Sequence, residues 1–443
     1  MKNSPVRPKG QKYITTIVIA IVSLFLFMCS CANQESSSGV KEKVLKDTQN
    51  KTKVVMKSRE KIDIEAKKAE IRKKIDEAMA KPQEENGWYN YEEASLSINL
   101  DGCANIVNLA DEKVSEKNLE LVKKLADQNE KAFAMVDKGF GKPGFQIPIN
   151  YDEGSAARVP NFLKLRSLTS LLVVAGNYER YNGNYPQAAQ RYIEALRLSQ
   201  GVAKNGTLIF GMIGVALEKK ALPALNELLR EPGISKETCR YILQEVTKIN
   251  SERVAFQDLM DCELLFVEIT MDLIKDSKFQ DMAELKMYSD PEVREKCLTR
   301  YEKWYCDITE YLQAEYPQAV ANLETLVVTN DNSPENFFIP NTSKAYKQYT
   351  LSTARYQGVL AMAALQVYKM DNSGYPANLE KLTPSYLNTV PVDPFTGKGL
   401  SYSLKNNSFV LYSIGTDMKD DGSVPAIDSI NTNGDLVFNS GIN

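Results

Sequence analysis

The chain has 443 residues, of which 43% are hydrophobic and 25% charged, with a formal net charge of -3. This composition is that of a globular protein with two or three folding units, and the small charge argues against a nucleic-acid partner. The sequence contains no histidine, which excludes Ser-His and Cys-His nucleophile pairs and histidine-ligated zinc.

The N-terminus carries a targeting pattern. Basic residues precede an apolar run, Ile14–Met28, that is short for a membrane-spanning helix. The run ends in the letters FMCSCA, which resemble a bacterial lipoprotein signal, where cleavage precedes a cysteine that then carries lipid. Cys31 is the first candidate for lipidation and Cys29 the alternative, so residues 1–31 would be a signal peptide. Ala32 then favours the outer membrane, facing the periplasm; an uncleaved membrane anchor is the competing interpretation.

Residues 32–85 are interpreted as a charged tether, flexible at first and then partly helical. Between Lys41 and Lys81 there are fourteen Lys/Arg and eight Asp/Glu residues. One narrow helical stripe consists of Ile64, Ile71, Ile75 and Met79. The basic surplus suits either a solvated spacer or a segment lying on anionic lipid headgroups.

Residues 86–340 are rich in helix formers and are interrupted by Gly, Pro and Asn clusters, which predicts antiparallel helix pairs. The most apolar piece after the N-terminus is Thr207–Leu217, TLIFGMIGVAL. It is too short to cross a bilayer, so we expect a helix buried in a bundle.

One stretch from Gly176 to Leu198, GNYERYNGNYPQAAQRYIEALRL, resembles a single tetratricopeptide repeat. The resemblance implies close helix approach at Gly176, a turn at Gly183 and packing of Tyr185 at that turn. The implied lining of the second helix is Ala188, Tyr192 and Ala195. We find no second copy at the expected period, so the sequence predicts an irregular helical-hairpin domain. Its groove would hold a peptide, or its role would be purely structural.

Residues 345–443 form the last predicted unit. Ser352–Met370 is interpreted as one helix, with Gly374 as its C-terminal cap. A proline-rich segment follows, with short helical turns at 379–387 and an extended run around Asp393. Strands are expected at 400–404, 409–414 and 435–438.

Three motifs in this unit, ALQVYKMDNSGYP, VPVDPF and LYSIGTD, resemble the globular part of the major pseudopilin of type II secretion. The resemblance covers about 90 residues from Ser352 onward. It implies a small α+β domain with a long helix and a three-stranded antiparallel sheet. A lipoprotein signal in place of the fibre-forming helix implies that the chain does not polymerise as pilins do. The whole combination resembles envelope lipoproteins of planctomycete-type bacteria.

The same resemblance implies calcium in the loop after the second strand. Asp417 and Asp428 match two ligand positions of the family, Ile414 would offer its backbone carbonyl, and Asp420 or Asp421 would lie between them. Calcium takes roughly six to eight oxygen ligands, which clustered carboxylates and carbonyls supply. The competing interpretation is a solvated acidic turn.

The sequence therefore predicts a mainly α, non-catalytic cell-envelope lipoprotein. We expect an interaction or scaffold role, linked to a type II secretion or pilus-like assembly, with an unidentified protein partner. The alternative is a carboxylate-dependent hydrolase acting on an envelope polymer. Its scattered acids, such as Asp261, Glu263 and Glu268, are more readily explained as a polar helix surface.

Overall fold

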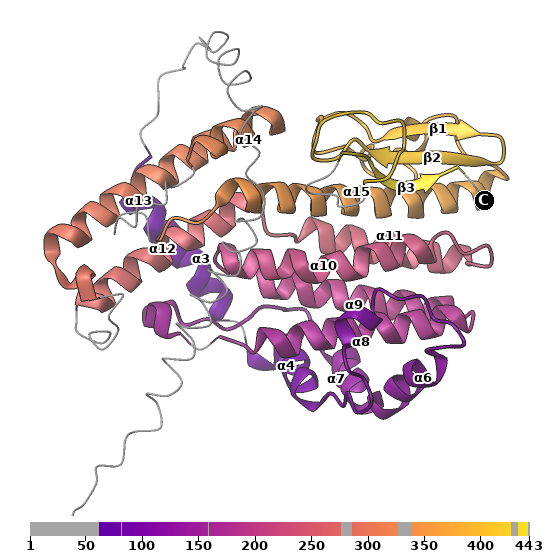
Figure 1. Cartoon of the computed structure of the whole chain (residues 1–443), viewed down its shortest axis with the longest axis horizontal. Coiled ribbons are helices and arrows are strands. Elements are labelled where there is room, and N and C mark those ends of the chain that lie inside the picture. The colour runs from indigo at the N-terminus through magenta and orange to yellow at the C-terminus, as the bar shows by residue number, and fades with distance from the viewer. Residues whose placement is uncertain are drawn as a thin grey trace, which may run out of the picture.

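The computed structural model describes residues 62–80, 82–157, 159–275, 286–326, 338–426 and 433–441. The fold is mainly helical, with one small three-stranded antiparallel sheet at the C-terminal end, as the sequence predicts (Figure 1). Cys29, Cys31 and Asp428 lie outside the described residues.

The helices follow one another along almost the whole described chain. They are α3 (Ile64–Met79), α4 (Trp88–Ser97), α5 (Ile106–Leu109), α6 (Leu119–Gln128), α7 (Glu130–Phe140), α8 (Phe162–Tyr181), α9 (Tyr185–Ala203), α10 (Leu208–Leu228), α11 (Lys236–Ser251), α12 (Phe256–Lys275), α13 (Pro291–Tyr311), α14 (Tyr316–Thr325) and α15 (Thr342–Asn372). The strands are β1 (Ser401–Lys405), β2 (Ser408–Ser413) and β3 (Leu436–Ser440).

Many helix starts are fixed locally by capping side chains. In each case a short polar side chain accepts a hydrogen bond from a backbone N–H of the first turn, which would otherwise lack a partner. The capping residues are Asp63 for α3, Asn161 for α8, Ser235 for α11, Asp290 for α13 and Asn341 for α15.

The helices form layers that follow the order of the chain. In Figure 1 the layers run upward from α4, α6 and α7 through α8 and α9 to α10 and α11, with α15 and then the sheet above them. The helices α12, α13 and α14 extend from one end of this stack. The predicted buried helix at Thr207–Leu217 is the first half of α10, and most of it is buried between α9 and α15.

One hydrophobic core runs through these layers from Ile71 of α3 to Phe438 of β3. It crosses the predicted boundary between residues 340 and 345, because α15 packs on α10 and α11 with one side and on the sheet with the other. Gly358 of α15 lies directly under the Phe438 ring, where an added Cβ would be 2.1 Å from a ring carbon. The C-terminal unit is therefore built onto the helical layers through a shared helix.

The helix α15 is longer than predicted. It begins at Thr342 rather than Ser352, and Ala345 and Leu351 in its extra turns are buried. Gly374 is not its cap: the helix continues to Asn372, and Ser373 takes the left-handed conformation with φ 59°.

The proline-rich segment is held by a buried carboxylate. Asp393 is 1% exposed and accepts hydrogen bonds from the backbone N–H groups of Phe395 and Ile414, both at 3.0 Å. Ser413 Oγ donates to it at 3.0 Å. Burial raises the pKa of Asp393, while these three hydrogen bonds act in the opposite direction. Asp393 thus fastens the segment to the end of β2.

The sheet has the order β1-β2-β3, with both pairs antiparallel. A two-residue turn joins β1 to β2, and Asn406 takes the positive φ of 47° that this turn needs. A bulge at Leu411 and Tyr412 shifts the register of β3 against β2. The turns predicted at 379–387 are a short 3-10 helix, Leu379–Leu382, followed by a turn over 383–386 in which the N–H groups of Tyr386 and Leu387 donate to the Leu382 carbonyl.

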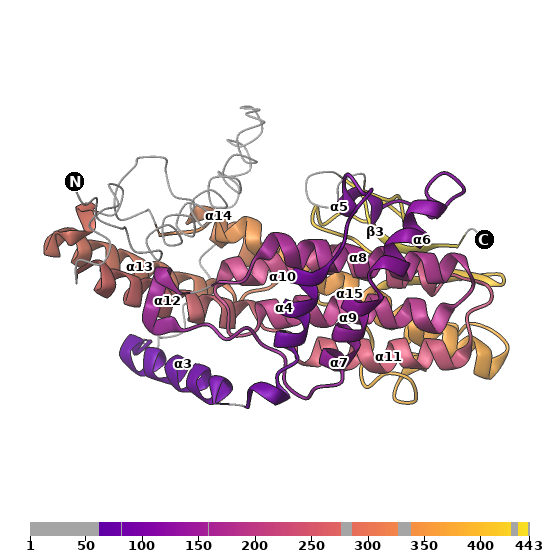
Figure 2. The same cartoon turned by 90° about the horizontal axis from the view of Figure 1, so that it is seen from below.

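Part of the predicted tether belongs to the folded body. Figure 2 shows α3 at the outer edge of the molecule, alongside α12. Ile71 and Ile75 of the predicted stripe are buried, so α3 is docked rather than surrounded by water.

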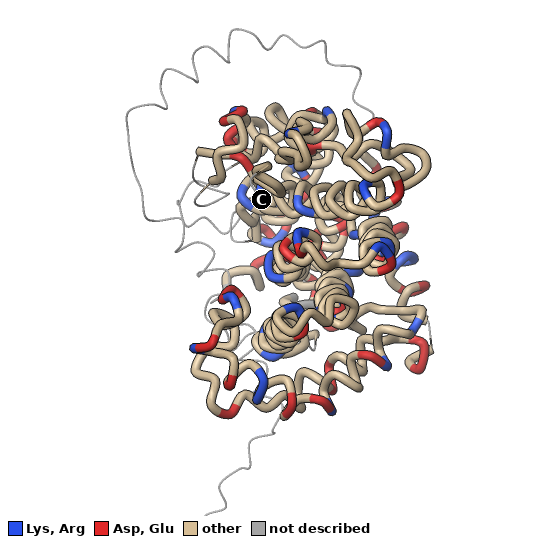
Figure 3. Tube along the Cα trace, turned by 90° about the vertical axis from the view of Figure 1, so that its right-hand side faces the viewer, with Lys and Arg blue, Asp and Glu red and all other residues tan. Residues whose placement is uncertain are grey.

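Charges are interspersed over the surface. In the view of Figure 3, acidic and basic residues are interspersed along the layers. Among the described residues, no helix is long and apolar enough to cross a membrane. The described cysteines form no disulfide with one another.

Candidate functional site

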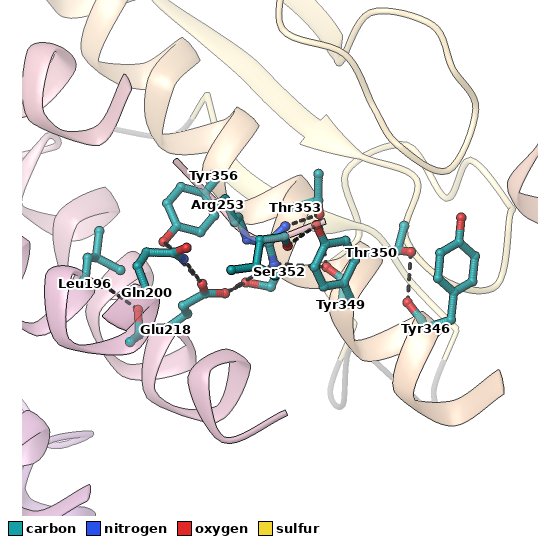
Figure 4. Close-up of polar contacts among 12 residues, drawn as sticks. Leu196, Gln200, Glu218, Arg253, Tyr346, Tyr349, Thr350, Ser352, Thr353 and Tyr356 are labelled. Carbon is teal, nitrogen blue, oxygen red and sulfur yellow. Dashed lines mark hydrogen bonds and ion pairs between the residues drawn. The ribbon is translucent and has the colours of Figure 1, made fainter. Parts of the chain in front are cut away.

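A buried polar cluster joins α9, α10, the loop before α12, and α15. Its centre is Glu218 of α10, which is 2% exposed. Arg253 places its Nη2 atom 3.4 Å from Glu218 Oε2. The side chains that bind one another here, which we call the junction cluster, are Gln200, Glu218, Arg253, Ser352 and Tyr356 (Figure 4).

Both oxygens of the Glu218 carboxylate have donors. Ser352 Oγ donates to Oε2, while Tyr356 OH donates to Oε1 at 3.3 Å. Gln200 Nε2 donates to the same Oε1 and also to the Tyr356 hydroxyl, at 3.1 Å. Since a buried carboxylate without partners would be strongly destabilising, these bonds favour one position of α15 against α9 and α10.

Arg253 extends the junction cluster along α15. Its Nη1 donates to Thr353 Oγ1 at 2.6 Å, and its guanidinium carbon lies 4.1 Å from the centroid of the Tyr349 ring. Burial alone lowers the pKa of Arg253, but Glu218 and the two neighbouring tyrosines outweigh burial and the net shift is upward. Removing either partner of the ion pair would leave a buried charge uncompensated.

A small cavity adjoins the junction cluster. Its volume is about 10 Å³, and its polar walls are Gln200, Glu218, Arg253 and Tyr349. Gln200 Oε1 is buried and accepts no hydrogen bond from any described residue. This volume suits one water molecule and no larger ligand. The junction cluster is therefore arranged to hold helices together rather than to receive a substrate.

A larger hollow of about 290 Å³ lies on the surface beside α4. It is a depression open to solvent rather than an enclosed chamber. Its walls are Gln83, Glu84, Tyr89, Asn90, Glu93 and Lys142. Asn90 Oδ1 is shielded from solvent and has no partner within the described residues.

The three acids considered for hydrolysis each bind a different partner. Asp261 is 4% exposed, so the prediction that it lies on a polar helix surface is wrong. Its carboxylate accepts a hydrogen bond from Tyr305 OH at 2.8 Å and forms an ion pair with Lys67. Glu263 accepts a hydrogen bond from the backbone N–H of Leu208 at 2.8 Å, which caps α10. Glu268 pairs with Lys68.

Each of the three carboxylates is therefore bound by its own partner, and the three do not form one acid pair. Burial raises the pKa of Glu263 to about 7, while its hydrogen bonds at the start of α10 act in the opposite direction. Its role as a cap explains the burial without a substrate.

A different acid pair, which sequence reasoning missed, lies between α7 and α9. Arg191 Nη1 donates to Asp137 Oδ1 at 2.6 Å and to Glu194 Oε2 at 2.7 Å. Gln190 Nε2 also bridges the two carboxyl groups. Burial raises the pKa of Glu194 to about 8 despite Arg191, because its side chain is fully enclosed. The raised pKa favours the protonated form of Glu194, which shares its donors with the Asp137 carboxylate.

The tetratricopeptide-like residues occupy one helical hairpin, α8 and α9. Gly176 lies against Tyr192, where an added Cβ would be 2.3 Å from a ring carbon. Gly183 has φ 80° in the turn, and Tyr185 begins α9. Ala188, Tyr192 and Ala195 are completely buried. The face formed by these residues of α9 is covered by neighbouring helices, among them α8 and α10.

The acidic loop after β2 is organised by hydrogen bonds. Asp417 accepts hydrogen bonds from the backbone N–H groups of Lys419 and Gly434, and Asp420 accepts one from Tyr412 OH at 2.8 Å. The backbone N–H of Ile414 donates to Asp393. Within the described residues, no three acidic or cysteine side chains gather closely enough to hold a metal ion. Because Asp428 lies outside these residues, calcium binding stays a prediction.

Asp435 is the central acid of this loop and was not among the predicted ligands. It is 1% exposed and accepts hydrogen bonds from the backbone N–H groups of Ser423 and Asp421, at 2.6 and 3.3 Å. Burial raises its pKa, its hydrogen bonds lower it, and the nearby Asp420 and Asp421 raise it further. Burial and, to a smaller extent, these two neighbouring acids therefore disfavour the ionised form of Asp435.

The signal that could have identified the junction cluster is slight. Glu218 and Arg253 are charged residues inside or beside strongly apolar helices, which is a mark of buried pairing, but their partners are distant in sequence.

No family model, no curated protein and no solved structure matches the chain.

Proposed function

We propose that the chain is a non-catalytic cell-envelope lipoprotein that serves as an interaction scaffold. The observation that supports this most is the junction cluster, which binds α15 and its sheet to the helical layers through a buried ion pair. Such a connection suits a rigid body that holds a partner at a fixed position. The partner would be a protein of a type II secretion or pilus-like assembly, as the pseudopilin resemblance implies.

Lipidation at Cys31 would attach this body to the outer membrane, facing the periplasm. The test is metabolic labelling with a palmitate analogue in a bacterial host. We expect the wild-type chain and Cys29→Ser to carry label and to fractionate with membranes. Cys31→Ser should lose the label. A labelled Cys31→Ser protein, or an unlabelled wild type, would contradict the proposed anchor.

The scaffold role is tested by crosslinking in the solubilised envelope. The full-length chain should capture a defined component of a secretion or pilus-like assembly. The Arg253→Met variant, which loosens α15, should capture less of it. Equal capture by both proteins, or no capture of such a component, would contradict the proposal.

A carboxylate-dependent hydrolase is the second candidate, and the Asp137–Glu194 pair favours it specifically. A carboxyl group with its pKa raised beside an ionised one is the arrangement of a general acid and its partner. Incubation with purified cell-wall polymer separates the two functions. Soluble fragments released by the wild type and not by Asp137→Asn would support the hydrolase, whereas release by neither supports the scaffold.

A further inference from the structure

The helix α3 is held to the body mainly by charged side chains. Lys67 Nζ lies 2.9 Å from Asp261, and Lys68 Nζ lies 2.9 Å from Glu268 of α12 and 3.2 Å from Glu302 of α13. Further ties are an ion pair between Arg72 and Asp152, and a hydrogen bond that Gln146 donates to the Ala78 carbonyl. We call the pairs of Lys67 and Lys68 the ionic clasp.

The apolar contact beneath α3 is small: it consists of the buried Ile71 and Ile75, with Ile64 and Met79 packing against the core while partly exposed. Only Lys68, Ile71 and Ile75 of its 16 residues are buried. In α9, by contrast, 14 of 19 residues are buried. Segments with few buried apolar contacts open at free energies below that of global unfolding. The attachment of α3 to the body therefore depends mainly on the ion pairs of the clasp. The attachment of a central helix such as α9 depends on its buried side chains.

Helix α3 has some local support of its own but is only marginally helical once it leaves the body, so its amides then become open to exchange. Asp63 caps its first turn, and Glu70 pairs with Lys74 within the helix at 2.7 Å. Pairs of this kind, four residues apart, stabilise helices without help from neighbours. Its departure would expose the carboxylates of Asp261, Glu268 and Glu302. Among the described residues, the ion pairs of these three acids are all with lysines of α3.

We propose that α3 is a releasable latch that sets how far the body stands from its membrane anchor. This inference rests on the proposed lipid anchor at Cys31. Lys67 and Lys68 lie nearer the N-terminal end of α3 than Ile71 and Ile75, so tension applied from the N-terminal side acts on the clasp first. The clasp then opens before Ile71 and Ile75, by peeling rather than by sliding along the whole helix.

Release lengthens the connection between membrane and body. The 16 residues of α3 add about 24 Å if they stay helical and about 54 Å if they are fully extended. The docked state holds the body close to the anchor, and the released state allows it to reach a partner further away.

Hydrogen–deuterium exchange of the full-length chain in detergent tests the latch. We expect the amides of 64–79 to exchange faster than those of α13 and to speed up when salt is raised from 50 to 500 mM, roughly several-fold because the clasp is ionic. Exchange of α3 at the same rate as α13 in both salts would overturn the proposal.

A pair of variants isolates the clasp. Lys68→Gln removes the pairs to α12 and α13 and should accelerate exchange of 64–79 about tenfold while α13 keeps its rate. Lys74→Gln is the matched control, since Lys74 pairs with Glu70 inside α3, and should change the rate by no more than about twofold. Acceleration of all helices together in Lys68→Gln would mean that α3 is an integral part of the core, and would refute the latch.

The exchange result does not depend on lipid. A chain that exchanges as expected but lacks palmitate at Cys31 retains the latch and refutes the anchor. A labelled chain whose α3 opens only with global unfolding refutes the latch and retains the anchor.

Discussion

Single residues in this protein act through what encloses them. Glu194 is the clearest case, because its carboxyl group is fully buried beside Asp137 and its pKa is raised from 4.5 to about 8. The folded state therefore holds the proton more tightly than the unfolded state. The stability that Glu194 contributes is fully present below pH 4.5 and is lost as the pH rises through 8.

Glu194→Gln should remove this dependence, since a glutamine amide keeps a donor toward Asp137 without a proton to lose. We expect the variant to gain about 1–3 kcal/mol of unfolding free energy relative to the wild type between pH 5 and pH 8. Urea unfolding of the variant and the wild type at pH 5 and at pH 8 measures this change in unfolding free energy. Glu130→Gln, an exposed position on α7, is the control and should run parallel to the wild type. A Glu194→Gln curve that also runs parallel would show that Glu194 is ionised at neutral pH.

Gly358 is the second residue whose surroundings decide its identity. An added Cβ would overlap the Phe438 ring, so Gly358→Ala should push β3 away from α15. We expect a loss of about 1–3 kcal/mol, despite the higher helix propensity of alanine. Gly399→Ala is the matched control, because its nearest neighbour would lie 3.8 Å from the new Cβ. Thermal unfolding of the two variants compares them, and equal melting temperatures would contradict this packing.

Among the elements, the acidic loop between β2 and β3 carries the most specific prediction. Its carboxylates accept hydrogen bonds, and burial disfavours the ionised form of Asp435, which a bound cation would offset. Calcium should raise the melting temperature of the full-length chain, and a chelator should reverse the rise. Asp417→Asn should weaken the effect, whereas Asp371→Asn, which lies at the end of α15, should not. Scanning calorimetry with and without calcium measures the melting temperature. A melting temperature that calcium does not change would contradict calcium binding and indicate a hydrogen-bonded turn.

The helices and strands themselves were largely predictable from sequence. The spacing of Ile64, Ile71 and Ile75 predicted α3, and the two runs on either side of the connection 405–408 predicted β1 and β2. The start of α15 was missed because its first ten residues are mostly polar and become helical by packing Ala345 and Leu351 into the body. Gly374 was assigned as the cap because glycine usually takes the left-handed position, which here belongs to Ser373.

The pairing of side chains was not predictable in the same way. Asp137 and Glu194 are far apart in the chain, and so are Glu218 and Arg253, so no local period links them. Asp393, in a loop rich in proline, gave no sign of burial, and its three hydrogen bonds come from two different parts of the chain. Local patterns identify elements, whereas buried polar partners depend on how the layers stack.

At the scale of the whole molecule, the junction cluster makes the layers and the C-terminal unit one body. Glu218→Gln and Arg253→Met should each cost about 3–5 kcal/mol of unfolding free energy, because each leaves its partner buried and unpaired. The double variant should cost clearly less than the two single losses together. Equilibrium unfolding in urea of the four proteins gives the coupling energy.

The control for this cycle is the exposed pair of Lys347 on α15 and Glu324 on α14. Its coupling should stay below about 1 kcal/mol. Equal coupling in the two cycles would mean that the junction cluster is no stronger than a surface contact. An early unfolding step confined to residues 345–443 would likewise contradict a single body.

The position of α15 near the end of the chain has a consequence for biogenesis. A polypeptide delivered across a membrane from its N-terminus presents α10 and α11 long before residues 342–372 arrive to cover them. During that interval Glu218 and Arg253 stand beside an uncovered apolar surface, so a prematurely terminated chain would leave that surface open to aggregation and proteolysis. Only a chain that includes α15 can therefore cover the apolar surface of α10 and α11.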